Sequence, residues 1–265
     1  MRPLSGEMSV SVSIICFNEE ENLRRCLESV SWADEIVVVD SFSQDRTLGI
    51  AKEYTGRVFE RGWTGYRDQK NFALSKCNGE WILSLDADEE VPDALREEVQ
   101  EEIRRSRKKE GYRIPRRSYY QGRWINHSGF YPDRQLRLFK RGLGAWVGGR
   151  VHERVEVQGR VGHLKNDLLH YPYGGTISGM LGKVDAFSSL TAEDMYDRGK
   201  RYHLRQLIVR PVTKFMEVYV LKLGFLDGLP GFIIASMSSI TMFVRYSKLR
   251  ELEIRARERP PTQIR

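Results

Sequence analysis

Short apolar runs alternate with helical patterns through the first hundred of the 265 residues. Strands are predicted at residues 10–17, 35–39, 57–60 and 80–85, and helices follow from about Asn18, Thr47, Asp68 and Val91. The run at 35–39 is almost continuously apolar, which is typical of a parallel strand covered on both faces. This βαβαβαβ order predicts an α/β fold with a mostly parallel sheet and helices on both of its faces.

The first predicted helix carries its own start signal. Asn18 is the expected N-cap, because Glu21 follows three residues later as in a capping box. The buried stripe of this helix is predicted to consist of Leu23, Cys26, Leu27 and Val30.

The pattern changes after Gly111. Short strands rich in aromatic residues and glycine are predicted at 112–120, 134–140, 150–157 and 168–173, and helices from Thr176 onward. The expected divisions are a tail (1–8), an α/β half (9–110), a small antiparallel extension with loops (111–175), a helical region (176–254) and a disordered tail (255–265).

Residues 215–246 are strongly apolar, but Gly228, Pro230 and Gly231 interrupt them. No uncharged run therefore reaches the roughly 18 to 20 residues of a clear spanning helix. Lysine and arginine flank both ends, so a pair of helices lying on a membrane surface is predicted. A buried core helix or a dimer helix is the alternative.

Charge and cysteine content limit the class of protein. The net charge is +7, and residues 104–165 are dense in arginine and lysine, which indicates either a solvated face or an anionic partner. Three cysteines without a C-x-x-C pair argue against a disulfide framework or a zinc site and fit a reducing compartment. The first residues lack the length and cleavage pattern of a secretory signal. Aromatic residues are not interleaved with the basic ones, so nucleic-acid binding is not favoured.

Polar residues follow three of the predicted strands: Asn18-Glu19, Asp40 and Asp86-Ala87-Asp88. Ligands of open parallel sheets bind beyond the carboxyl ends of the strands, and acidic groups that meet there require a cation or hydrogen-bond donors between them. Asp86 and Asp88 are two residues apart, so both carboxylates face one side of an extended chain and suit Mg²⁺ or Mn²⁺. A D-x-D by itself is weak, and capping of the next helix is the alternative. The G-x-G-x-x-G, P-loop and Ser-His-Asp signatures are missing from the sequence.

Four separated motifs resemble the family 2 inverting glycosyltransferases, in order and in spacing. They are Ser11-Val-Ser-Ile-Ile-Cys-Phe-Asn-Glu-Glu20, Ile36-Val-Val-Val-Asp-Ser-Phe-Ser-Gln-Asp-Arg-Thr47, Gln69-Lys-Asn71 and Leu85-Asp-Ala-Asp88. Residues 63–71, 133–139, 151–153 and 169–173 also look like the bacterial branch that includes the lipopolysaccharide core β-1,4-glucosyltransferases. The resemblance implies the GT-A fold, a Rossmann-like nucleotide-diphospho-sugar transferase fold.

The resemblance also implies roles for individual residues. The implied contacts of the nucleotide sugar are Phe17, Asn18, Glu19, Asp40, Lys70, Asn71, Asp86, Ala87 and Asp88. Among these, Asp40 is expected at the base, Lys70 near the diphosphate and Asp86 near the ribose. Asp88 is the main predicted metal ligand, with Asp86 and His170 as further ones. Asn18 as a helix cap and Lys70 as an exposed helical lysine are the alternatives.

Inverting transfer needs one base to deprotonate the acceptor hydroxyl. The downstream Glu-Asp pair that many family members carry is missing, so Glu153 is predicted as the base and Asp133 as the second choice. His152 could orient the base or contact phosphate. Arg134 and Arg137 could neutralise phosphate or form a charged strand edge.

The resulting expectation is a membrane-associated cytoplasmic enzyme that moves a hexose, glucose, from a UDP-sugar to a lipopolysaccharide core acceptor. The same chemistry on a polyprenyl-phosphate, a capsule glycan or a peptide is one alternative. A non-catalytic scaffold that binds nucleotide sugars is the other.

Overall fold

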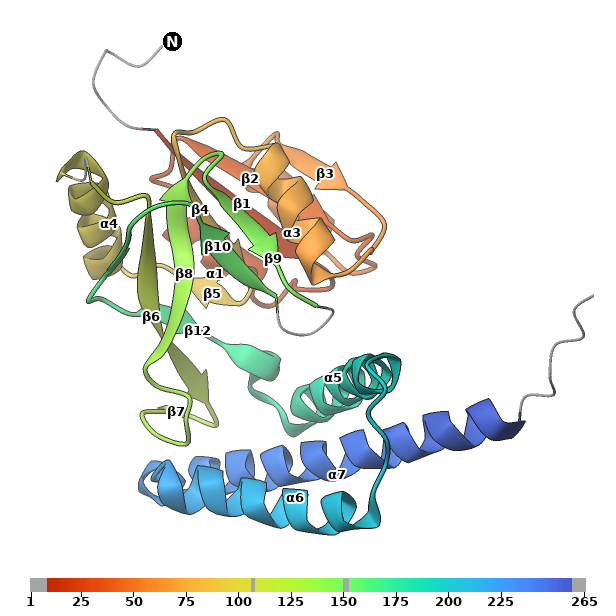
Figure 1. Ribbon diagram of the computed structural model, residues 1–265. Helices are drawn as coiled ribbons and strands as arrows, with labels where there is room; N and C mark the ends of the chain where they lie inside the picture. Colours follow the sequence, from red (N-terminus) through yellow and green to blue (C-terminus); the bar gives the residue numbers. More distant parts are fainter. Residues whose placement is uncertain (1–8, 106–107, 150–152, 259–265) are drawn as a thin grey trace, which may run out of the picture. The chain divides into compact units, whose positions relative to one another are not determined.

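The computed structural model describes residues 9–105, 108–149 and 153–258, which form two compact units. The sheet unit consists of the described residues within 1–119, 132–148 and 152–174 (Figure 1). The helical unit consists of those within 120–131, 149–151 and 175–265. Residues 120–131, which belong to the expected extension, thus group with the C-terminal helices.

The main sheet has the strand order β3-β2-β1-β4-β8-β6-β12-β5, and β11 pairs with β6. The bounds are β1 Val10–Cys16, β2 Glu35–Asp40, β3 Val58–Glu60, β4 Trp81–Asp86, β5 Glu89–Glu90, β6 Gly111–Tyr120, β8 Asp133–Lys140, β11 Val161–His163 and β12 Leu168–His170. Strands β3, β2, β1 and β4 are parallel, whereas β8 is antiparallel to both β4 and β6. A separate antiparallel pair joins β9 (Gly144–Val147) to β10 (Arg154–Val157). The expected α/β class, with a mostly parallel sheet and a small antiparallel extension, is confirmed.

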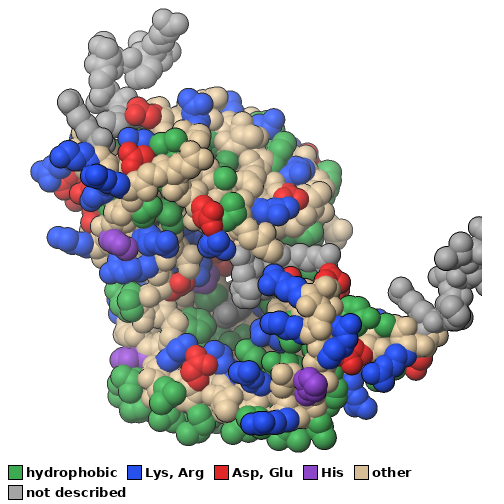
Figure 2. Space-filling view, in the orientation of Figure 1, with side chains coloured by type: hydrophobic (Ala, Val, Ile, Leu, Met, Phe, Trp, Pro, Cys, Tyr) green, Lys and Arg blue, Asp and Glu red, His purple; other side chains and the backbone are tan. Residues whose placement is uncertain are grey.

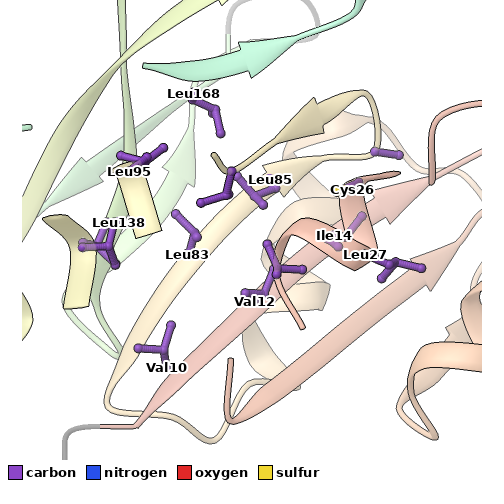
Figure 3. Close-up of a cluster of buried hydrophobic side chains, with 14 of the residues drawn as sticks. Val10, Val12, Ile14, Cys26, Leu27, Leu83, Leu85, Leu95, Leu138 and Leu168 are labelled. Atoms are coloured by element: carbon purple, nitrogen blue, oxygen red, sulfur yellow. The ribbon is translucent and has the colours of Figure 1, made fainter. Parts of the chain in front are cut away.

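Among the described residues, the α-helices of the sheet unit are α1 Leu23–Ser29, α2 Thr47–Tyr54, α3 Tyr66–Ser75 and α4 Asp93–Arg105. Successive strand residues point to opposite faces, so Val38 and Val37 enter different cores. The larger core joins the strands to α1, α2 and α4 (Figure 3). The smaller core includes Ile82, Phe139 and Trp146, and Leu74 of α3 packs against it.

The helical unit contains α5 Ile177–Asp197, α6 Leu204–Met216 and α7 Gly228–Glu258, together with the short strand β7 (Arg123–Trp124). Helix α7 packs against both α5 and α6. A single π-helical turn (Glu217–Leu221) and a 3₁₀ helix (Gly224–Asp227) connect α6 to α7. Among the described residues, one stretch, Gly224–Glu258, is long and apolar enough to cross a membrane by length and composition.

The predicted start of the first helix was wrong. Helix α1 begins at Leu23 with Asn22 in the N-cap position, whereas Asn18 has a left-handed backbone with φ of 51°. The Asn18 side chain is used elsewhere, because its Oδ1 accepts a hydrogen bond from the Gln44 amide. The predicted stripe of α1 was correct, since Leu23, Cys26, Leu27 and Val30 are all buried.

Candidate active site

The carboxyl ends of β1, β2 and β4 meet at one edge of the sheet. Cys16 is in register with Asp40 of β2, and Ile15 is in register with Asp86 of β4. The three polar segments singled out in the sequence therefore follow neighbouring parallel strands, where ligands of such sheets bind.

Hydrogen bonds tie the loop after β1 to the loop after β2. The Asn18 amide donates to Ser43 Oγ at 2.9 Å, and the Glu19 amide donates to Thr47 Oγ1 at 2.7 Å. Asp40 is fully buried, and its carboxylate accepts a hydrogen bond from the Ser43 amide at 2.8 Å. Phe17 is 53% exposed, so an aromatic surface is available beside this fixed pair of loops.

Asp86 is held by two cations. Lys70 Nζ lies 2.9 Å from its Oδ1, and Arg137 Nη2 lies 2.5 Å from its Oδ2. Burial by itself would raise the pKa of Asp86, but Arg137 and Lys70 outweigh it and hold the pKa well below its usual range. Both carboxylate oxygens of Asp86 are therefore engaged by cations, which favour its ionised form.

Lys70 is buried rather than an exposed helical lysine. It lies on α3 with its Nζ 4.1 Å from the centroid of the Trp146 ring and 3.5 Å from Glu153 Oε1. Its neighbour Asn71 fixes the same region, because the Asn71 amide group donates to the Trp146 carbonyl and accepts from the Trp146 amide. Helix α3 and strand β9 thus position one ammonium group between the Asp86 and Glu153 carboxylates.

Glu89 and Arg116 extend this set of alternating charges. Arg137 Nη2 is 2.6 Å from Glu89 Oε1, and Arg116 Nη1 is 3.0 Å from the same oxygen. Arg116 Nη2 is in turn 2.6 Å from Asp133 Oδ2. We call the resulting series the ion chain; its members, in spatial order, are Glu153, Lys70, Asp86, Arg137, Glu89, Arg116 and Asp133.

Asp88 lies outside the ion chain and faces His170. His170 Nε2 is 3.5 Å from Asp88 Oδ2, and its Nδ1 is 2.9 Å from Ser118 Oγ. Two ligands that each lie about 2.1 Å from one divalent cation can be separated by about this distance. Among the described residues no three His, Cys, Asp or Glu side chains gather closely enough to enclose a metal. The chemistry of the pair would suit a divalent cation such as Mg²⁺, which usually keeps several ligands from outside the protein.

The structure thus places the predicted residues in three groups. Phe17, Asn18 and Glu19 lie in the loop after β1, Asp40 is the last residue of β2, and Asp88 and His170 form a facing pair. Lys70, Asp86, Glu153 and Asp133 belong to the ion chain. Ala87, the middle residue of the motif, is buried, and His152 lies outside the described residues.

Sequence reasoning missed Glu89 and Arg116 and gave Arg137 a different role. Arg137 is only 2% exposed and paired with two carboxylates, so it is part of the interior and not a free phosphate ligand. A signal was present in β8, where Arg137 stands between the apolar residues Leu136 and Leu138 in a strand that is buried on both faces.

Residues 11–156 match the family described as glycosyl transferase family 2. The chain therefore belongs to this family, and its α/β sheet unit has the GT-A type of fold that the sequence motifs implied.

The relatives extend beyond the sheet unit. The lipopolysaccharide core biosynthesis glycosyltransferase LpsC of Rhizobium meliloti is 34% identical over 251 residues, which cover 92% of each chain. An uncharacterized glycosyltransferase of Rickettsia typhi is 29% identical and covers 94% of this chain and 89% of its own. Among solved structures, residues 1–349 of S. aureus TarS match 97% of this chain and 93% of that chain, with 16% identity and a TM-score of 0.49.

Proposed function

We propose that this chain is a metal-dependent, inverting hexosyltransferase that moves glucose from UDP-glucose to a lipopolysaccharide core sugar. The observation that carries the proposal is the pairing of Asp88 with His170 next to the Asp86–Lys70 ion pair at the carboxyl end of β4. The name of the Rhizobium meliloti relative supports the choice of acceptor.

Different residues have different roles in binding the donor. Phe17, Asn18, Glu19 and Asp40 line the nucleotide side, and Asp88 with His170 would hold Mg²⁺ or Mn²⁺. Such a cation neutralises the negative charge of a leaving diphosphate. Asp86 serves the ribose side, where its fixed orientation follows from its two cationic partners.

Glu153 is the preferred base. Its side chain is 15% exposed, and its contact with Lys70 Nζ, at 3.5 Å, is longer than that of Asp86. Asp133 is less suitable because Arg116 binds its Oδ2 through both Nε and Nη2, and Gln135 donates to its Oδ1. In the proposed displacement the acceptor oxygen bonds to the anomeric carbon while the bond from that carbon to the diphosphate breaks. The hydroxyl proton goes to Glu153, and UDP leaves.

The proposed location is the inner face of the cytoplasmic membrane, where a lipid-linked acceptor is found. The apolar α6 and α7 would rest on that surface, and the basic residues of the middle region would meet phosphate groups on the acceptor or the lipid.

A donor screen tests the reaction class. Purified protein with Mg²⁺ or Mn²⁺ is offered a panel of nucleotide sugars, and released nucleoside diphosphate is measured with core oligosaccharide, polyprenyl phosphate or peptide as acceptor. UDP-glucose with the core acceptor should give the fastest release. Preference for another acceptor would redirect the substrate assignment, and absence of turnover with every pair would favour a scaffold.

Asp88→Ala tests the metal assignment. We expect the release of UDP to fall by about two orders of magnitude, and direct binding of Mn²⁺, followed by electron paramagnetic resonance, to weaken. Asp93→Ala is the matched control, because the Asp93 side chain is 83% exposed on α4. Unchanged Mn²⁺ binding in Asp88→Ala would remove Asp88 from the metal site.

Glu153→Gln tests the base. The variant should bind UDP-sugar as the wild type does and lose transfer to the acceptor. Full transfer activity would move the assignment to Asp133.

A further inference from the structure

Exposed large hydrophobic side chains are concentrated in the helical unit. Among the described residues, all but three of them (Phe17, Phe42 and Trp63) belong to it. Figure 2 shows hydrophobic side chains together with lysine and arginine over the region of α6 and α7. The densest group is the connection between these helices, which we call the apolar turn. It comprises residues 220–229, with exposed Val220, Leu221, Leu223, Phe225, Leu226 and Leu229.

Helix α6 continues the same surface. Leu204, Ile208, Val212 and Met216 are spaced four residues apart and are all exposed, so they form one apolar stripe that leads into the turn. Leu221 and Leu229 are the most exposed members of the turn, at 77% and 70%. Side chains of this kind are rarely grouped in contact with water unless they bind something.

The charges beside this surface are cationic. Residues 204–244 contain the basic side chains Arg205, Arg210, Lys214 and Lys222, but their only carboxylates are Glu217 and Asp227. Glu217 is neutralised by Lys214 at 3.0 Å and by Lys222 at 2.6 Å. Asp227 is fully buried. The surface therefore combines exposed apolar groups with positive charge, which is complementary to anionic lipid head groups.

Asp227 fixes the shape of the apolar turn. Its carboxylate accepts hydrogen bonds from the amides of Asn126 and His127, each at 3.0 Å, and from Ser128 Oγ at 2.9 Å. The Ser128 amide in turn donates to the Lys222 carbonyl at 2.8 Å. These hydrogen bonds explain why a buried carboxylate occurs in such an apolar segment. Asp227 holds the turn against loop 126–128, while the leucines and Phe225 remain exposed.

We infer that the apolar turn is a preformed wedge that enters the head-group region of an anionic lipid leaflet, with α6 lying along the surface. This inference rests on the proposed membrane association and assigns it to one segment. A second copy of the chain is the competing occupant; the bilayer is favoured because the surface offers positive charge and lacks a free carboxylate that could pair with the same charge on a copy.

Vesicle flotation of the full-length chain tests the wedge. Wild-type protein should float with vesicles of phosphatidylcholine and phosphatidylglycerol, and much less with phosphatidylcholine alone. The double variant Leu226→Glu/Leu229→Glu should bind about tenfold more weakly or worse, because two large apolar side chains no longer leave water. Ile254→Glu, at an exposed apolar position near the end of α7, should float like the wild type. Hydrolysis of a UDP-sugar in solution should be equal in all three proteins.

A fluorescent label on the apolar turn provides an independent measurement. The three native cysteines are buried, so a cysteine introduced at Leu226 or Ile254 can be labelled alone with an environment-sensitive dye. The emission should shift to the blue with anionic vesicles for the label at 226 and stay unchanged for the label at 254.

The outcomes separate the wedge from the wider proposals. Equal flotation of wild type and double variant overturns the wedge and leaves membrane association intact. Failure of the wild type to float overturns both, whereas failure of UDP-sugar turnover concerns only the proposed reaction. A dimer in light scattering that the double variant abolishes, without any binding to vesicles, would assign the turn to a second copy.

Discussion

At the scale of single residues, Glu89 is the hub of the candidate site although it touches neither proposed substrate nor proposed metal. It is fully buried, and its Oε1 accepts from Arg137 and Arg116 while its Oε2 accepts from the Asp86 amide at 2.9 Å. A buried carboxylate survives only with such compensation, because the cost of removing it from water is several kcal/mol. Glu89 thus fixes the position of Asp86 in two ways. It accepts a hydrogen bond from the Asp86 amide, and it binds Arg137, which in turn binds the Asp86 carboxylate.

We therefore predict that Glu89→Gln lowers the free energy of unfolding by about 3–5 kcal/mol, because the buried Arg137 and the partly buried Arg116 lose a shared anion. Urea unfolding followed by circular dichroism measures this loss. Glu97→Gln, at an exposed position of α4, should change stability by less than about 0.5 kcal/mol. A Glu89 variant as stable as that control would show that the buried charges do not depend on one another.

Asp86 should make stability depend on pH in acid. Its pKa is lower in the folded chain than in the unfolded one, so its contribution is complete above the unfolded value of about 3.9 and is lost as the pH falls through the folded value. The stability difference between wild type and Asp86→Asn should thus be large at neutral pH and shrink below about pH 4. Denaturant unfolding at several pH values measures it. For exposed Asp93→Asn the difference should stay small throughout.

Sequence patterns located these residues only in part. Asp40, Asp86 and Asp88 could be predicted to share an edge because strand order fixes where parallel strands end. The ion pair between Asp86 and Arg137 could not be predicted from the sequence. It depends on the antiparallel register of β8 against β4 and β6, and the two residues are 51 positions apart.

At the level of the elements, the connection between α6 and α7 requires a glycine for steric reasons. A Cβ on Gly231 would lie 1.9 Å from the Gly224 carbonyl oxygen, so the first turn of α7 can approach the 3₁₀ helix only with glycine at this position. From the sequence, Gly228, Pro230 and Gly231 were predicted to interrupt the apolar segment. That Gly231 is the glycine that cannot be replaced depends on its contact with Gly224, seven residues earlier.

Gly231→Ala should accordingly destabilise the chain, by about 1–3 kcal/mol, since the backbone has to move. Gly182→Ala is the matched control, because Gly182 lies within α5 and has open space around the added methyl group. That control should be neutral or stabilise by about 0.5–1 kcal/mol through helix propensity. Thermal unfolding of both variants measures the contrast, and equal melting temperatures would contradict the steric argument.

The short elements were the hardest to predict. Strands β5, β9 and β11 have two to four residues each, too few to show a period. Yet β9 carries Trp146, whose backbone is clamped by Asn71 and whose ring covers Lys70. The sequence motifs therefore identified Lys70 as a candidate site residue, but they did not predict β9, whose Trp146 covers it.

At the scale of the whole molecule, the first hundred residues were read most successfully, because long buried strands and amphipathic helices carry strong periodic signals. The helix predicted to begin at about Thr47 is α2, which begins at that residue, and predicted strand 35–39 falls within β2. The grouping of residues 120–131 with the C-terminal helices depends on the buried Asp227, which a linear pattern does not reveal.

The cysteines provide a global test of the native state. Cys16 and Cys26 lie in the larger core and Cys77 in the smaller one. Burial raises the pKa of all three thiols, that of Cys77 to about 12. We predict that Ellman's reagent finds no reactive thiol in the native protein at pH 8 and finds all three in denaturant. Fast reaction of any of them under native conditions would contradict the packing of that core.

The ion chain has a consequence for the history of this enzyme. Each of its inner members compensates the neighbours on both sides, so a single replacement leaves an unmatched charge in the interior, whereas a paired replacement can restore the balance. Substitutions of ion-chain members should therefore be inherited as coupled pairs. Descendants that acquire a new donor sugar should change in the loops around the ion chain rather than in its members.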